Sequence, residues 1–346
     1  SAGHIFSRSS SIPLNRLIRY VNDGASISGE EERALFLQYE VDPIRSIQRE
    51  MFLLQGVKGN RVDPYYAYRL GALGKKIVEL VAPMRSANPS FREQYYTDVD
   101  AAIAGIRLQS SPRKMVEPQL YFNRMLREAG ANDSAIMVDY RSGLGITGIG
   151  GGLLPADASR AVDAVVDVWY TIFRSRVASV DVSKSNMREY MLSAIDFYLR
   201  NDNIAEVNDV YLRAKEKYIL TPEMRRTIGD LYYENEYFSE ALMVYGELLD
   251  EDPGIREVSK RIAEYYVSVG DAALAENNLE DARDAFLLAV ESDVLHPEAQ
   301  RKLVLTSRSI EKREQRFAES QGLIEAAQRG GMEAEEMELR RDYARA

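Results

Sequence analysis

A period of 34 residues constrains the fold of this chain more than any other feature. Residues 188–221 and 222–255 align at an offset of 34 without a gap, and Tyr198 then falls on Tyr232. A third stretch, residues 263–296, aligns after an insertion of seven residues. Seven residues are about two helical turns, so the insertion keeps the face of the helix. Such a period predicts stacked helix–turn–helix units, because one unit alone cannot bury its apolar face.

The middle unit has the clearest pattern of small, aromatic and helix-ending residues. Counted from Pro222, positions 8, 11, 20, 24 and 32 are Gly229, Tyr232, Ala241, Tyr245 and Pro253. We expect the small residues to let paired helices approach closely and the tyrosines to fill the space between them. Pro253 should end the second helix. This pattern resembles the tetratricopeptide repeat (TPR) family.

The other two units match the family to different degrees. In the third unit the corresponding places hold Gly270, Ala282, Phe286 and Ala289. The first unit has Ile195 and Val207 where small residues belong, so it should be a looser or capping repeat. The resemblance implies an α-solenoid of about three repeats over residues 188–296, followed by capping helices and a tail over residues 297–346.

The rest of the chain divides at its proline-rich and glycine-rich stretches. Residues 1–12 are rich in serine and are expected to be disordered. Residues 13–135 carry apolar residues at helical spacing, with helices restarting after Asp42-Pro43 and Asp63-Pro64, which predicts an N-terminal helical domain. A Gly-rich loop follows, and then a connecting or capping helix: residues 136–155 and residues 156–187. The predicted fold class is therefore all-α, apart from one short hairpin near 136–152.

The Gly-rich stretch contains G-x-G-x-x-G at Gly143, Gly145 and Gly148. A dinucleotide site needs a helix to begin within this motif, so that its amides face the pyrophosphate. Here "IGGGLLP" intervenes, and three glycines before Leu-Leu-Pro should not continue into a helix. We favour a loop between two helical domains and expect no cofactor. An anion resting on the loop amides and a true nucleotide fold are the alternatives.

Composition and charge exclude several kinds of site and partner. The chain has no cysteine, and only His4 and His296, so we expect neither a metal site nor a catalytic nucleophile of the cysteine type. The net charge of −10 argues against nucleic acid. No stretch approaches the roughly 20 apolar residues of a membrane-spanning helix. The chain begins without methionine, which fits a removed signal peptide or anchor as well as a residual tag.

The resemblance also implies where a partner binds. In TPR proteins the second, fifth, ninth and twelfth positions of each unit line a concave groove, and here the second is always Glu and the ninth always Asp. Residues 222–300 hold 19 acidic and 6 basic side chains, which suggests a basic partner. A solvated helix surface is the alternative, since acids near a helix N-terminus favour the helix dipole. The predicted partner-binding residues are Glu189, Asp196, Leu199, Glu223, Asp230, Tyr233, Glu264, Asp271 and Leu274.

These observations predict a non-enzymatic scaffold that holds a protein partner with a basic segment in an acidic, Tyr-lined groove. Together with the family, the absence of cysteine favours a bacterial envelope assembly, such as a secretion, pilus or flagellar-motor accessory, in the periplasm or envelope rather than the cytoplasm. An enzyme or small-molecule binder with its site in the N-terminal helical domain near the Gly-rich loop is the alternative, although no pair of acids has a diagnostic spacing. The formation of a homo-oligomer is a further alternative that the sequence leaves open.

Overall fold

The computed structural model confirms the all-α fold class, since every regular element in its described part is a helix. The chain forms two compact units, Ser1–Leu220 and Thr221–Ala346. The first predicted repeat therefore belongs to the first unit. The disorder expected for residues 1–12 lies outside the described residues, which are 14–36, 42–58, 62–109, 111–175, 184–216 and 220–345.

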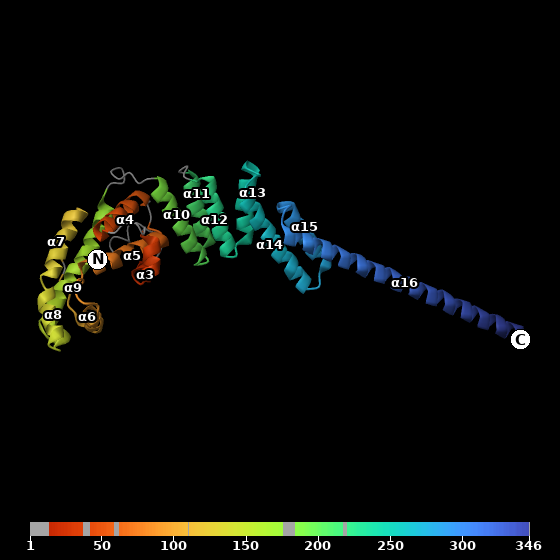
Figure 1. Cartoon of the computed structure of the whole chain (residues 1–346), viewed down its shortest axis with the longest axis horizontal. Coiled ribbons are helices and arrows are strands. Elements are labelled where there is room, and N and C mark those ends of the chain that lie inside the picture. The colour runs from red at the N-terminus through yellow and green to blue at the C-terminus, as the bar shows by residue number, and fades with distance from the viewer. Residues whose placement is uncertain are drawn as a thin grey trace. The chain divides into compact units, whose positions relative to one another are not determined.

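The first unit is built from short and medium helices (Figure 1). Four of them start at a proline that follows a capping Asp, Asn or Glu, as the sequence predicted for the first two of these four. Proline suits the first helical turn because its missing N–H would have no partner there. The elements are α2 (Leu14–Ala25), α3 (Gly29–Leu35), α4 (Pro43–Val57), α5 (Pro64–Val81), α6 (Pro89–Ala102), η1 (Ile103–Gly105), α7 (Pro118–Gly130), α8 (Asp133–Arg141), η2 (Gly145–Thr147), α9 (Ile149–Arg174), α10 (Lys184–Leu199) and α11 (Ile204–Glu216).

Helix α5 lies at the centre of the first unit, where α2 and α9 pack on it. The backbones of α2 and α5 touch at two glycines. A Cβ on Gly24 would lie 1.9 Å from the carbonyl oxygen of Tyr68, and one on Gly71 would lie 2.0 Å from that of Val21. No larger residue fits either position without moving a helix.

The Gly-rich stretch is mostly helical, so the predictions of a loop over 136–155 and of a hairpin near 136–152 are wrong. Helix α9 starts at Ile149 and includes Pro155 and the three consecutive glycines at 150–152. It begins there because the buried Asp139 carboxylate accepts a hydrogen bond from the Gly150 amide at 2.7 Å, which satisfies a donor of the first turn. The glycines allow this approach, since a Cβ on Gly148 would lie 2.4 Å from the Asp139 carboxyl carbon.

The predicted first repeat, α10 and α11, packs within the first unit. The ring of Tyr65 on α5 lies 5.1 Å from that of Tyr190 and 5.3 Å from that of Phe197, measured between centroids. The Tyr198 hydroxyl donates to Asp63 Oδ1 at 3.1 Å. Aromatic packing therefore joins α10 to the N-terminal helices.

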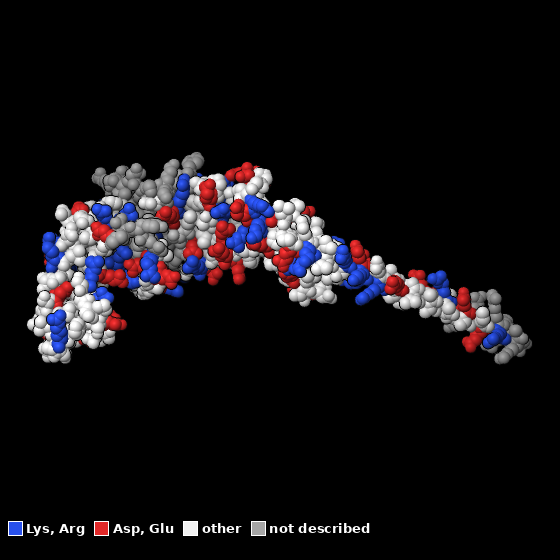
Figure 2. Space-filling model, in the orientation of Figure 1, with Lys and Arg blue, Asp and Glu red and all other residues white. Residues whose placement is uncertain are grey.

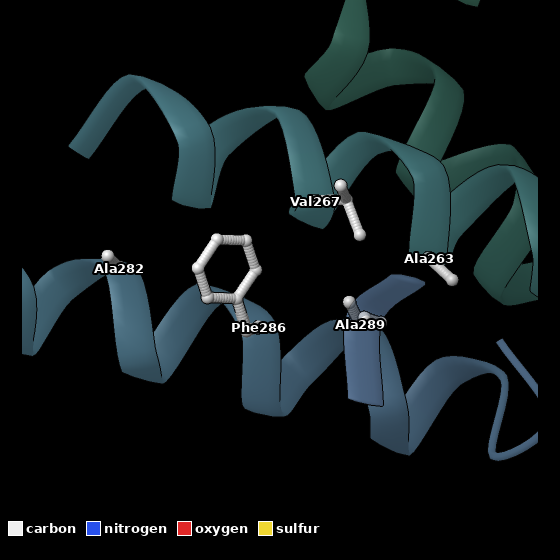
Figure 3. Close-up of a cluster of buried hydrophobic side chains, with 6 residues drawn as sticks. Ala263, Val267, Ala282, Phe286 and Ala289 are labelled. Carbon is white, nitrogen blue, oxygen red and sulfur yellow. The ribbon is translucent and has the colours of Figure 1, made fainter. Parts of the chain in front are cut away.

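Over its described residues, 221–345, the second unit has five helices, and consecutive helices pack on one another. Two close approaches occur where the repeat pattern predicted small residues. A Cβ on Gly229 would lie 2.4 Å from the Tyr245 ring, and one on Gly270 would lie 2.4 Å from the Phe286 ring. Figure 3 shows Phe286 between Ala282 and Ala289, turned toward the facing helix. The helices are α12 (Pro222–Glu234), α13 (Phe238–Glu251), α14 (Arg256–Ala275), α15 (Leu279–Ser292) and α16 (Pro297–Arg345).

Candidate partner-binding face

The predicted partner-binding residues are divided between the two units. On α10, in the first unit, Glu189 is exposed, and Asp196 pairs with Arg200 at 2.9 Å. Leu199 is only 2% exposed. The prediction that it contacts a partner is wrong for this conformation, because α10 packs against α4, α5 and α11 and more than one of its faces is covered.

In the second unit, α12 and α14 border a hollow of about 450 Å³. It contains two predicted residues from different repeats, Asp230 and Glu264. The Arg261 guanidinium lies between them, 3.9 Å from each carboxylate. The lining residues are Arg226, Asp230, Glu257, Val258, Lys260, Arg261 and Glu264. With the adjoining Tyr233, we call this surface the α12–α14 face.

The packing between α12 and α13 orients Asp230. The Tyr245 hydroxyl, from α13, donates a hydrogen bond to Asp230 Oδ1 at 2.6 Å. Burial raises the pKa of Tyr245, and this hydrogen bond raises it further, so the phenol stays protonated and keeps donating. Asp230 therefore has a fixed orientation while its side chain stays one-third exposed.

Aromatic side chains border the charged part of this face. The Arg261 guanidinium lies 5.4 Å from the centre of the Tyr233 ring. Phe238 contacts the rings of Tyr233 and Tyr265, with centroids 5.3 Å and 5.0 Å away. A cation over an aromatic ring and an edge-to-face ring pair are both favourable arrangements. The rings hold Arg261 beside the carboxylates.

Most of the predicted acids are already paired with basic residues of the chain itself. Glu264 lies 3.4 Å from Lys260, and Asp271 lies 2.6 Å from Lys302, which also pairs with Glu298. Glu223 is exposed in the first turn of α12, and Leu274 is 36% exposed. Arg226, the fifth position of the middle unit, and Glu257, from the insertion, also line the hollow and make no ion pair within the described part of the chain.

The sequence contained a signal for this pairing. The seven-residue insertion before the third unit reads "REVSKRI" and holds three of the six basic residues between 222 and 300. It extends α14 by about two turns, which brings Lys260 and Arg261 into the hollow beside Asp230. The spacing alone predicted only that the insertion keeps the face of the helix. Figure 2 shows the result as basic and acidic side chains interleaved on this unit.

Histidine and the carboxylates form no metal centre in the part of the chain that the structure describes. His296 is buried, and its Nδ1 accepts a hydrogen bond from the Ala299 amide at 3.2 Å. It therefore caps the N-terminus of α16. Within the same described ranges, no helix has the length and apolar character needed to cross a membrane.

No protein-family model, curated protein or solved structure matches the chain. The resemblance to TPR proteins therefore stays a prediction that rests on the repeat pattern.

Proposed function

We propose that this protein is a non-enzymatic scaffold of TPR type, and that its second unit holds a protein partner on the α12–α14 face. The observation that carries the proposal is the arrangement of Asp230, Glu264 and Arg261 beside Tyr233 in one open hollow. A bacterial envelope assembly is the setting that we propose. The enzyme alternative gains no support at the Gly-rich stretch, where Asp139 is buried and bonded to Gly150.

The partner in this proposal contributes a basic segment. Its Lys or Arg side chain replaces Arg261 between the two carboxylates. This exchange costs little, because a pair of exposed side chains is worth only about 0–1 kcal/mol. The excess of acids over residues 222–300 attracts such a segment over a longer range and speeds association at low salt. Tyr233 supplies the apolar contact, and tyrosine is frequent among the residues that dominate binding.

Site-specific photocrosslinking tests where the partner binds. A benzophenone amino acid replaces Tyr233 in one variant and Met243 in a control. Met243 is 61% exposed on α13 and is not among the residues of the α12–α14 face. In cells that make the protein, we expect an adduct through position 233 but not through 243, with the crosslinked peptide rich in Lys or Arg. Equal adducts at both positions, or an acidic crosslinked peptide, would contradict the proposal.

A pair of matched double variants then tests the charges. Asp230→Asn with Glu264→Gln removes two charges from the face, and Asn keeps an oxygen for the Tyr245 hydroxyl. Asp250→Asn with Glu291→Gln removes two charges from exposed residues of α13 and α15. With the crosslinked partner, we expect the first variant to bind at least tenfold more weakly, which corresponds to about 1.4 kcal/mol, and to lose much of its salt dependence. An equal loss in the second variant would show that only the overall charge matters.

A further inference from the structure

A second hollow lies in the first unit and takes no part in the proposed scaffold function. It has a volume of about 360 Å³, between the C-terminal end of α5, helices α6 and α9, and residues 106–108. Its walls are apolar and include Val99, Ile103, Leu108, Leu154, Ala161 and Val162. Three of these, Ile103, Leu108 and Val162, are 41–48% exposed. The cavity thus has an apolar interior and an apolar mouth.

Two buried polar residues line this cavity and have unused hydrogen-bonding capacity. Tyr95 is 1% exposed, and within the described ranges its hydroxyl has no hydrogen-bond partner. Asp157 is 4% exposed. Its Oδ1 accepts from Arg160 Nη2 at 2.6 Å and from Asn132 Nδ2 at 3.2 Å, while its buried Oδ2 has no partner. Leaving a buried acceptor unpaired is unfavourable, so a ligand that donates a hydrogen bond to Asp157 Oδ2 is stabilised there.

The charges around the cavity select the sign of the ligand. Asp100 and Asp157 are among the lining residues, and no Lys or Arg is. Burial raises the pKa of Tyr95, and the negative charge of Asp157 raises it further. The phenol therefore remains neutral. Arg160 lies outside the lining and pairs with Asp157 Oδ1 at 2.6 Å, so the polar groups left for a ligand are the unpaired Asp157 Oδ2, the Tyr95 hydroxyl and Asp100. None of these groups is a cation, so a ligand with an ammonium group is favoured over an anion.

We propose that this cavity is a binding site for a small apolar amine. The hydrocarbon or aromatic body lies between α6 and α9, and the ammonium group donates to Asp157 Oδ2 and the Tyr95 hydroxyl. The volume is at the small end of the range for ligand sites, about 300–1,000 Å³. Apolar walls with a few convergent polar groups are typical of such sites.

Three probes with one carbon skeleton test the chemical class: 3-phenylpropylamine, 3-phenylpropan-1-ol and 3-phenylpropanoate. Each is titrated into the full chain by calorimetry and by saturation-transfer NMR. We expect the amine to bind at least tenfold more tightly than the alcohol, and the carboxylate to bind least. Equal binding of all three would show an apolar hollow without selectivity. If none of the three binds, water alone satisfies the hydrogen-bonding capacity of Asp157 Oδ2. Either result overturns the proposal.

Variants locate the site. Ala161→Leu fills the wall, and Tyr95→Phe removes the free hydroxyl. The control, Tyr140→Phe, removes a hydroxyl that is bonded to Asp98 and does not line the cavity. Circular dichroism and Trp169 fluorescence check that each variant is folded. We expect the first two to weaken amine binding tenfold or more and the control to leave it unchanged. Unchanged binding in a folded Ala161→Leu variant would place the amine elsewhere.

Discussion

At the scale of single residues, the glycines show what a sequence motif can and cannot predict. The sequence argument against a dinucleotide site at G-x-G-x-x-G assumed that no helix follows the glycines, and this assumption is wrong, because α9 begins at Ile149. In the first turn of this helix, the Gly150 amide donates a hydrogen bond to the carboxylate of Asp139 from the same chain. Asp139 and Gly150 are eleven residues apart, so no local pattern showed that they would meet. Gly229 was predictable because its partner recurs with the repeat, whereas Gly24 and Gly71 had no such signal.

Neighbouring glycines of α9 should respond differently to the same substitution. A Cβ on Gly151 would lie 2.0 Å from the Ile146 carbonyl oxygen, whereas one on Gly152 meets nothing within 4 Å. We expect Gly151→Ala to lower the free energy of unfolding by about 1–3 kcal/mol. Gly152→Ala should raise it by about 0.5–1 kcal/mol, since alanine is the better helix former. Urea denaturation followed by Trp169 fluorescence measures both. Equal effects would mean that the turn before α9 is not packed as described.

At the scale of elements, α9 shows how a polar stripe can be as informative as an apolar one. The sequence predicted a helix over residues 156–187, whereas α9 spans Ile149–Arg174. The prediction made no use of four acceptors at intervals of four residues: Ser159, Asp163, Asp167 and Thr171. They share one face and hold Gln109 and residues 111–116. The amides of Gln109, Lys114 and Val116 donate to Ser159, Asp167 and Thr171 at 2.9, 3.2 and 3.0 Å, and Arg113 pairs with Asp163 at 2.9 Å.

Removing one acceptor should release this extended segment. Asp167 is 3% exposed and also accepts from the Tyr121 hydroxyl at 3.1 Å. We expect Asp167→Ala to cost about 1.5–3 kcal/mol, the range for hydrogen bonds to a charged group. Limited trypsin digestion should then cut faster after Arg113 and Lys114. Asp100→Ala, at an exposed position, is the control and should leave the digestion unchanged. No acceleration in the Asp167 variant would mean that other contacts hold the segment.

Helix pairing in the second unit gives a test of the repeat register. Ala241 is fully buried on α13, at the twentieth position of the repeat. We expect Ala241→Leu to overpack this contact and to cost about 1–3 kcal/mol. Leucine at the exposed Met243 should change stability by less than about 0.5 kcal/mol. Circular dichroism during denaturation measures the difference. An unchanged midpoint for Ala241→Leu would show that the repeat register is wrong.

At the scale of the whole molecule, the main division of the chain lies later than the repeat pattern predicted. The repeat pattern grouped residues 188–296 together, but the first compact unit ends at Leu220 and the second begins at Thr221. The period predicted the helix pairs correctly, but it could not show which other helices each pair would pack against. Tyr190 and Phe197 direct the first pair to the N-terminal helices through Tyr65. The sequence signal for this was the presence of Ile195 and Val207 where the repeat pattern expects small residues. Both of these larger side chains are fully buried.

Two units with separate cores should lose their structure in separable steps, and the only tryptophan makes this measurable. Trp169 is buried on α9 in the first unit, so its fluorescence reports that unit alone. Gly270 lies in the second unit, where a side chain would meet the buried Phe286 ring. We expect Gly270→Val to cost about 1–3 kcal/mol or more by overpacking. The midpoint by circular dichroism should fall, because dichroism reports the helices of both units.

The Trp169 midpoint in Gly270→Val should stay at its wild-type value, since the first unit keeps all its contacts. Gly246 is the matched control because it lies inside α13 and a Cβ there meets nothing within 4 Å. Gly246→Ala should leave the dichroism midpoint unchanged or raise it, since alanine is the better helix former. A Trp169 midpoint that falls together with the dichroism midpoint would show that the two units unfold as one cooperative body.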